Sequence, residues 1–285
     1  MKCNRVLITG ANGLLGSAVV ETFRLNTGAQ IVGVGRHELD ISNAEHVAST
    51  LEGFRPDLVI NCAAYTKVDD CEAHEDHARS VNADGAGHVA CVAAAIGADL
   101  IHISTDYVFN GNAVAPIPED TEPGAPEHLC AYGRTKRLGE ELVRQNHPRA
   151  VIVRTAWLFG RDGASFPRTV LQWAQSGMPL RIVGDQTGSP TYVNDLALGL
   201  LELVQHDVKG TYHFTNEGSC TWHAYAGEVL RNAGIIANIE TITSEQLGRP
   251  AKRPKFSVLD MTQFIAHTGH RSRPWQAALG EFLRE

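Results

Sequence analysis

The chain has 285 residues, of which 43% are apolar, so it can bury a sizeable core as one large domain or two small ones. Its 32 acidic and 25 basic side chains leave a formal charge of -7, and no basic stripe is present, which argues against nucleic acid as the main partner. No stretch approaches the roughly 18 apolar residues of a membrane span, and residues 1–10 lack the apolar core of a signal peptide. We therefore expect a cytoplasmic protein without a membrane partner.

Strand-like and helix-like runs alternate through the N-terminal half. We expect strands at 5–10, 29–35, 56–64 and 99–105, and helices at 12–25, 43–54 (with Ser42 as N-cap) and 77–97. Strands that are apolar throughout and alternate with helices are typical of a doubly wound parallel sheet with helices on both faces. The sequence thus predicts an α/β fold.

The regular alternation of strands and helices ends in the second half, which contains more loops. After a Pro-rich loop we expect a helix at 134–146, a strand at 150–160, a loop at 183–195, a helix at 196–205, a strand at 210–216 and a basic segment at 248–260. We interpret residues 1–160 as the sheet domain and residues 161–285 as mainly a smaller, C-terminal substrate-binding lobe. Some segments of that lobe are expected to return to the sheet domain.

Six cysteines are scattered without a C-x-x-C pair, which favours reduced, mostly buried thiols over a disulfide framework. One segment, CEAHEDH, brings Cys71, His74 and His77 together in sequence. On a single helix these positions point to different faces and cannot converge on one ion. We expect a polar helix surface there and no metal site.

Three glycines mark the first strand-to-helix turn. In ITGANGLLG, Gly10, Gly13 and Gly16 allow a tight turn, close approach of a pyrophosphate and close packing of the helix on the strand. Their spacing is G-x-x-G-x-x-G, which differs from the commonest dinucleotide fingerprint. In the first βα turn of a chain with repeated βα units, it predicts a Rossmann-type NAD(P)-binding domain.

The end of the second strand indicates which dinucleotide binds. The sequence VGVGRHE puts Arg36 there, and an arginine suits the 2'-phosphate of NADP, whereas an acidic residue suits the ribose of NAD. Glu38 is close enough in sequence to leave NAD open. We therefore predict NADPH as the preferred cofactor, with NADH as the alternative.

The segment CAYGRTK places Tyr132 four residues before Lys136. Residues i and i+4 share a helix face, so we expect the ammonium of Lys136 to lie near the phenol of Tyr132. A nearby cation lowers the pKa of a tyrosine from about 10 toward the range of a proton donor, and the same ammonium can bind ribose hydroxyls of a nicotinamide cofactor. Two residues that merely share a surface are the alternative.

A polar group ends the strand expected at 99–105. Ligands of open α/β sheets bind at the carboxyl ends of strands, which is where Ser104, Thr105 and Asp106 stand. A hydroxyl there can hydrogen-bond a carbonyl oxygen as negative charge develops on it during hydride transfer. The sequence therefore predicts a reductase site with Thr105, Tyr132 and Lys136 as its catalytic residues.

Several motifs together carry a family resemblance over residues 5 to about 260. They are TGANGLLG, NCAAYTKVDDCE, VNADG, ISTDYVFNG, AYGRTKRLGEE, RTAWLFG and RPKFSVLD. With these motifs the chain resembles the extended short-chain dehydrogenase/reductases, and among them the dTDP-4-dehydrorhamnose reductases. The resemblance implies NAD(P)H-dependent reduction of the C4 ketone of dTDP-4-dehydro-L-rhamnose to dTDP-L-rhamnose.

The resemblance also implies roles for individual positions. On the cofactor side it implies Gly10, Gly13, Leu14 and Leu15 at the pyrophosphate, Asp40 and Ile41 at the adenine, and Ala63, Ala64 and Tyr65 toward the nicotinamide. On the substrate side it implies contacts of the sugar nucleotide with Thr105, Asp106, Tyr132, Trp157 and Arg253. Some relatives are magnesium-binding homodimers, which leaves a homodimer open here, but no acidic cluster in this sequence requires the metal.

Two other functions fit the same motifs. A reductase or epimerase of another 4-keto-deoxysugar nucleotide shares the scaffold. The regulatory β subunit of methionine adenosyltransferase shares the fold and retains the tyrosine and lysine, so a non-catalytic dinucleotide-binding subunit is also open. The loop before Tyr132, EPGAPEHLCAYG, is longer than the family pattern and leaves the substrate edge unsettled.

Overall fold

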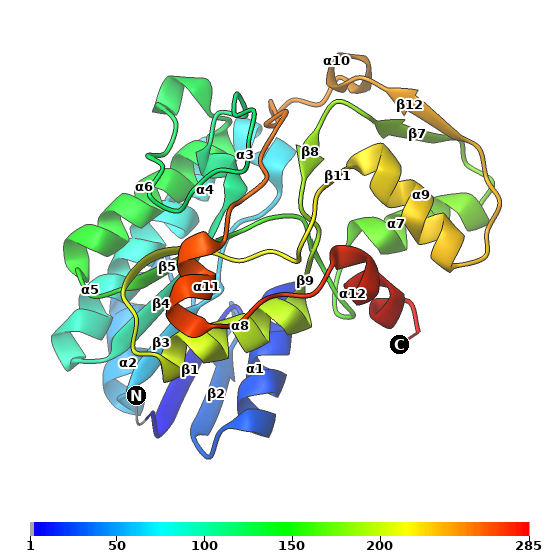
Figure 1. Cartoon of the computed structure of the whole chain (residues 1–285). Helices are drawn as coiled ribbons and strands as arrows, with labels where there is room; N and C mark the ends of the chain where they lie inside the picture. The colour runs from blue at the N-terminus through cyan, green and yellow to red at the C-terminus, as the bar shows by residue number, and fades with distance from the viewer. Residues whose placement is uncertain (1–2, 285) are drawn as a thin grey trace.

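A six-stranded parallel sheet forms the centre of the larger lobe in the computed structural model, which describes residues 3–284 (Figure 1). The strand order is β10-β5-β4-β3-β1-β2. The chain leaves β1 toward β2 and then returns to the other side of β1 with β3, so the order reverses between β1 and β3. The doubly wound parallel sheet predicted from the sequence is confirmed.

The elements of this larger lobe have the following bounds. The sheet comprises β1 (Arg5–Thr9), β2 (Gln30–Val34), β3 (Leu58–Asn61), β4 (Asp99–Thr105), β5 (Val151–Thr155) and β10 (Gly210–His213). The helices are α1 (Leu14–Asn26), α2 (Ala44–Phe54), α3 (Val68–Ala73), α4 (Glu75–Arg79), η1 (Ser80–Gly85), α5 (Ala86–Ile96), η2 (Asp106–Val108), η3 (Pro126–His128), α6 (Ala131–Asn146), α8 (Val193–Gln205) and α11 (Thr262–Thr268).

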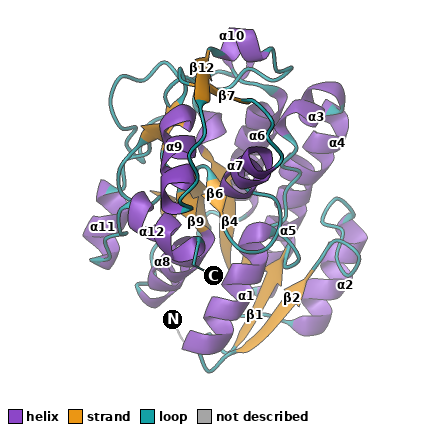
Figure 2. Cartoon of the chain, turned by 90° about the vertical axis from the view of Figure 1, so that its right-hand side faces the viewer, coloured by secondary structure: helices purple, strands orange, loops and turns teal. Residues whose placement is uncertain are grey.

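Helices cover both faces of the sheet because alternate strand residues face opposite ways. Val6 and Ile8 of β1 belong to a core with α1 and α8, whereas Leu7 belongs to a second core with α2, α5 and α6. Figure 2 shows α1 and α2 on opposite sides of β1 and β2. Both α8 and β10 follow residue 160, so parts of the C-terminal half lie with the sheet.

The smaller lobe, on the right in Figure 1, has its own core, in which Tyr225 and Trp275 are buried. Three short strand pairs belong to the second half of the chain: β7 with β12, β8 with β11, and β6 with β9. The bounds are β6 (Leu158–Phe159), α7 (Phe166–Gln175), β7 (Leu180–Val183), β8 (Thr187–Gly188), β9 (Thr191–Tyr192), β11 (Cys220–Thr221), α9 (Trp222–Asn232), β12 (Ile239–Ile242), α10 (Ser244–Leu247) and α12 (Trp275–Phe282).

Three differences from the predicted elements have local causes. The helix expected at 77–97 contains a π turn, η1, between α4 and α5. The strand expected at 150–160 ends at Thr155, because Trp157 adopts a left-handed backbone (φ 47°) that no strand continues through. The N-cap of α2 is Asn43, whose side chain accepts from the backbone N–H of His46, and the prediction of Ser42 was wrong.

The loop expected at 183–195 contains β8 and β9, and patterns as short as two residues carry no detectable period. The CEAHEDH segment is two helices instead of one, since α3 ends at Ala73 and α4 begins at Glu75. Cys71 is buried there, while the ring of His77 packs against Tyr65. Among residues 3–284, no helix has the length and apolar character that crossing a membrane requires.

Candidate active site

A cavity of about 580 Å³ lies at the carboxyl ends of the strands, where the strand order reverses. Its size falls within the range of ligand sites, and its position is where open α/β sheets bind ligands. The predicted site residues in its lining are Gly10, Gly13, Leu14, Leu15, Gly16, Arg36, Asp40, Ile41, Ala63, Ala64, Tyr65, Ser104, Thr105, Asp106, Tyr132, Lys136 and Trp157. Of the site residues predicted from the sequence, only Arg253 lies outside this lining.

The glycine turn forms one end of this cavity. Gly10 has a left-handed backbone (φ 65°), and a Cβ there would lie 2.8 Å from the Ala63 nitrogen. A Cβ on Gly16 would lie 2.1 Å from the Gly10 oxygen, so only glycine lets α1 begin this close to β1. The first turn of α1 consequently presents free N–H groups to the cavity, an arrangement that fits a dinucleotide pyrophosphate.

The end of β2 presents an arginine, while the carboxylate of Glu38 is hydrogen-bonded within the turn. Arg36 is exposed, and its Nε lies 3.9 Å from Asp40 Oδ2. Glu38 accepts a hydrogen bond from the Gly35 N–H at 2.9 Å, so its carboxylate stabilises the turn. Ser42 hydrogen-bonds Asp40 and lowers the pKa of that carboxyl. Arg36 is therefore the side chain at this end that is available to a phosphate.

The start of α6 is held by the neighbouring helices α3 and α4. The Ala131 N–H donates to Glu72 of α3 at 2.7 Å, which caps the helix. Arg134 donates two hydrogen bonds to Glu75 of α4, at 2.8 and 2.7 Å. The helix begins three residues earlier than predicted, so Tyr132 lies in its first turn and is fixed at the cavity wall.

The phenol of Tyr132 is buried, and burial raises its pKa above the ordinary value. The Thr105 hydroxyl hydrogen-bonds the phenol and opposes that rise. The prediction that Lys136 lowers this pKa was wrong for the structure as it stands. The ammonium is instead directed to the Ile103 carbonyl oxygen, 2.7 Å from Nζ, and to His102 Nε2, at 3.3 Å.

Burial also shifts the lysine itself. It lowers the pKa of Lys136 to about 8, while the charges of Glu140 and Cys62 partly oppose this shift. An ammonium has three N–H donors, of which the Ile103 carbonyl takes one and His102 takes a second when its Nε2 carries no proton. The third donor is free for a ligand in the cavity that Lys136 lines.

The end of β4 separates two roles among its polar residues. Thr105 and Asp106 line the cavity, and Asp106 Oδ2 accepts a hydrogen bond from Ser257 at 2.5 Å. Burial raises the pKa of Asp106 to about 6, opposed by hydrogen bonds from Ser257 and Thr105. Ser104 also lines the cavity, but its hydroxyl donates to the buried Glu140 at 2.6 Å.

The far end of the cavity is aromatic. The indole of Trp157 stacks on that of Trp222, with ring centroids 3.6 Å apart and planes within 12°. Gln186 accepts a hydrogen bond from Trp222 Nε1 at 3.1 Å. These contacts hold Trp157, which lies between β5 and β6, against α9 of the smaller lobe.

Arg253 lies outside the lining of this cavity. Its guanidinium forms a bidentate pair with Asp69, both hydrogen bonds being 3.0 Å long. It borders a small neighbouring hollow together with Tyr107, whose ring packs edge-on against Tyr132 at 5.5 Å. Arg253 therefore lies behind Tyr107, one side chain removed from Tyr132.

Sequence reasoning missed other residues of the lining. Beside the lining residue Val81, the buried Asn82 of the π turn accepts a hydrogen bond from the Tyr65 N–H at 2.7 Å and donates to Thr135 of α6 at 3.2 Å. It thereby ties the segment after β3 to the helix of Tyr132, and π turns often mark functional sites. The lining residues not predicted are Asn12, Gly35, Leu39, Cys62, Thr66, Val68, Val81, Ile103, Tyr107, Thr155, Ala156, Leu158 and Ala164. Most adjoin a quoted motif, which is the signal that could have found them.

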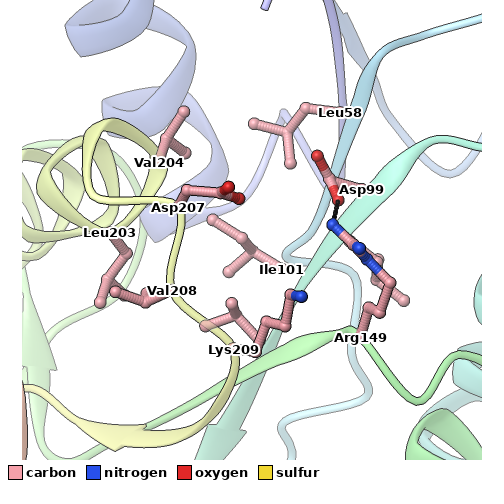
Figure 3. Close-up of a pocket in the computed structure, with 11 residues that line it drawn as sticks. Leu58, Asp99, Ile101, Arg149, Leu203, Val204, Asp207, Val208 and Lys209 are labelled. Carbon is pink, nitrogen blue, oxygen red and sulfur yellow. Dashed lines mark ion pairs between the residues drawn. The ribbon is translucent and has the colours of Figure 1, made fainter. Parts of the chain in front are cut away.

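A second hollow lies at the opposite edge of the sheet, where β3, β4 and β5 begin (Figure 3). Asp99 and Arg149 approach to 3.9 Å there, and Asp207 and Lys209 border it. Its volume of about 10 Å³ is that of a single water molecule. The hollow is too small for an organic ligand.

Comparison with known proteins identifies the family of this chain. The chain belongs to the family described as "RmlD substrate binding domain", whose model matches residues 4–285. The chain is 40% identical to a dTDP-4-dehydrorhamnose reductase of Streptomyces griseus, covering 97% of this chain and 92% of the relative. It is also 40% identical to a probable dTDP-4,6-dihydroxy-2-methyloxan-3-one 4-ketoreductase of Streptomyces antibioticus, covering 97% and 94%.

A solved structure shows the same fold. The crystal structure of a dTDP-4-dehydrorhamnose reductase from Bacillus anthracis, in complex with NADP, matches with a TM-score of 0.93 at 35% identity and covers 99% of both chains. The family resemblance that the sequence motifs indicated is confirmed.

Proposed function

We propose that this protein is an NADPH-dependent reductase that converts the C4 ketone of dTDP-4-dehydro-L-rhamnose to the alcohol of dTDP-L-rhamnose. The observation that carries the proposal is that Thr105, Tyr132 and Lys136 line one cavity with the glycine turn of β1. The names of the relatives and the NADP of the neighbouring structure support the reaction and the cofactor. Arg36 at the end of β2 supports NADPH over NADH.

In this proposal a bound nicotinamide supplies the hydride that reaches C4. Tyr132 donates its phenolic proton to the C4 oxygen, and Thr105 donates a hydrogen bond to the same oxygen as charge develops on it. Because burial raises the pKa of Tyr132, the phenol carries its proton at neutral pH, which is the form a proton donor needs. Lys136 directs its free donor into the cavity, where it holds the ribose.

The smaller lobe and the segment around Arg253 are proposed to bind the sugar nucleotide. Asp106, fixed by Ser257, is placed to accept a hydrogen bond from a sugar hydroxyl. Trp157 lines the cavity while its indole stacks on Trp222, and we propose that it contacts the sugar or the base. Arg253 is proposed to support this binding from its position behind Tyr107.

Substitution of Tyr132 by Phe tests the proposal. Wild-type protein should oxidise NADPH when given dTDP-4-dehydrorhamnose, and Tyr132→Phe should lose about 10²–10⁴-fold of that rate. Tyr212→Phe is the matched control, because it removes a hydroxyl that bonds His267 away from the cavity. Normal turnover by the Tyr132 variant would refute its role as proton donor.

A reductase of another 4-keto-deoxysugar nucleotide is the second candidate. The Streptomyces antibioticus relative carries such a name at the same 40% identity. Initial rates with a panel of dTDP-linked 4-keto sugars separate the two candidates. Tight NADPH binding without turnover of any of these sugars would instead indicate a regulatory, non-catalytic subunit.

A further inference from the structure

Three strands of the sheet carry a buried row of polar side chains. Thr9, Asn61 and His102 are register partners on β1, β3 and β4, and each is at most 1% exposed. Thr9 Oγ1 lies 2.6 Å from Asn61 Oδ1, and Asn61 Nδ2 lies 3.1 Å from His102 Nδ1. Hydrogen bonds thus run in series across the sheet and end at His102, whose other ring nitrogen lies against Lys136. We call these three residues the polar row.

The polar row has two self-consistent patterns of hydrogen bonds. When Lys136 is charged, His102 Nε2 must accept from it, so the ring proton lies on Nδ1 and Asn61 turns its oxygen toward the ring. When Lys136 is neutral, its lone pair accepts from Nε2–H, and Nδ1 accepts from Asn61 Nδ2, as the amide is oriented in the structure. The two patterns differ by one proton, one imidazole tautomer, a half-turn of the amide and the direction of the Thr9 hydroxyl, which donates to Asn61 Oδ1 in the structure.

We propose that His102 is a positioning residue for Lys136, and that its two tautomers couple the charge of the lysine to the polar row behind it. The neutral imidazole accepts one N–H of the ammonium, the Ile103 carbonyl accepts the second, and the third is thereby aimed at the cavity. The value of this device for catalysis rests on the proposed function of Lys136. The coupling itself is a property of the protein without substrate.

The charged and titratable groups around Lys136 do not prevent its deprotonation near neutral pH. Glu140 and Arg144 act on the pair from α6, and Cys62 acts from the end of β3. Burial lowers the pKa of His102 well below its usual value, so the ring stays neutral in both patterns. Burial raises the pKa of Cys62 to about 12, and Glu140 stays ionised with Arg154. Lys136 is therefore the member of this set that titrates near neutral pH.

The titration of Lys136 in the full-length, substrate-free protein tests the proposal. The chain has only six lysines, so a protein labelled with ¹³C at lysine Cε gives a simple NMR spectrum, and Lys136→Met identifies the resonance. We expect Lys136 to titrate near pH 8. His102→Leu removes the acceptor and should lower that midpoint by about one pH unit, since a charged hydrogen bond is lost. His102→Gln keeps an amide that can accept or donate and should retain the wild-type midpoint.

The tautomer of His102 is the second readout. Ring ¹⁵N shifts, assigned by their loss in His102→Gln, should report Nδ1–H below the midpoint of Lys136 and Nε2–H above it. A tautomer that stays constant while Lys136 titrates, or equal midpoints in His102→Leu and wild type, would overturn the proposal. If His102→Leu does not fold, the tautomer of the unmodified protein decides alone.

A kinetic arm separates this proposal from the proposed function. With turnover, the high-pH limb of kcat/KM should move down by about one unit in His102→Leu and stay in place in His102→Gln. A coupled titration in a protein that turns over no sugar nucleotide would leave His102 in its role and refute the reductase. A pH profile identical in all three proteins would refute the role of His102 alone.

Discussion

Helix α6 buries two opposite charges one turn apart, and their surroundings differ. Lys136 is 2% exposed and Glu140 is fully buried. Glu140 receives two hydrogen bonds from Arg154, at 2.9 and 2.8 Å, and others from Arg144 and Ser104. Lys136 has only neutral partners, the Ile103 carbonyl and His102. The same helix face thus contains one charge paired with opposite charge and one held by dipoles.

This difference in partners decides what each charge can do. Burial disfavours ionisation of Glu140, but Arg154 and Arg144 outweigh burial and lower the pKa of the carboxyl to about 2. Burial lowers the pKa of Lys136 to about 8 because no carboxylate contacts it. The paired charge is fixed over the physiological pH range and fastens α6 to β5. The charge held by dipoles remains adjustable, which suits a group that handles a ligand.

Breaking the paired charge should have the largest effect. Arg154→Met leaves the carboxylate of Glu140 buried with only Arg144 and Ser104, and we expect a loss of about 3–5 kcal/mol in the free energy of unfolding. Urea denaturation measures this loss. The rate per folded molecule should change little, because neither Glu140 nor Arg154 lines the cavity.

The double variant Arg154→Met/Glu140→Leu is the control for that loss. Removing both charges leaves no buried carboxylate, and Arg144 is exposed enough to reach solvent, so most of the stability should return. A single variant within about 1 kcal/mol of the wild type would show that the pair does not fasten the helix, and the contrast with Lys136 would fail.

The charge of Lys136 should appear as a pH-dependent stability. Its pKa is about 8 in the folded protein, below the ordinary lysine value of 10.5, so the unfolded chain binds more protons between these values. The contribution of Lys136 to stability is therefore fully present above about pH 10.5 and is lost as the pH falls through about 8. The span corresponds to roughly 3 kcal/mol.

Comparison with Lys136→Met isolates this contribution, because other groups that titrate at high pH cancel in the difference. The variant should be more stable than the wild type at pH 7, and its advantage should shrink by roughly 3 kcal/mol as the pH rises from 8 to 10.5. Lys209→Met, at an exposed lysine, should show no such slope. A constant difference across this range would mean that Lys136 is not a destabilised cation.

The sequence predicted which residues line the cavity more accurately than it predicted the role of each residue there. Alternating strands and helices predicted the sheet, and a parallel sheet places its strand ends together, so Gly10 and Thr105 were expected at one edge. The spacing of Tyr132 and Lys136 placed both on one helix face. The shift of the phenol pKa was predicted with the wrong sign, because burial raises this pKa and the ammonium of Lys136 is bonded elsewhere, and both depend on tertiary packing.

The polar row was beyond sequence reasoning for a related reason. Thr9, Asn61 and His102 belong to three strands far apart in the chain, and only the register of the sheet makes them neighbours. The stacking of Trp157 on Trp222 of α9 is likewise a contact between segments far apart in the chain. Long-range pairings of this kind leave no local pattern in the sequence.

Another ion pair of α6, between Arg134 and Glu75, is exposed and therefore tests the comparison without burial. Arg134 and Glu75 form two hydrogen bonds, as Arg154 and Glu140 do, but their side chains are 30% and 44% exposed. Because water solvates both groups when they separate, Glu75→Gln should cost at most about 1 kcal/mol in urea denaturation. A loss near the 3–5 kcal/mol expected for Arg154→Met would show that bidentate geometry, and not burial, stabilises these pairs. The difference between Glu140 and Lys136 would then depend on the number of hydrogen bonds that each forms, and not on burial.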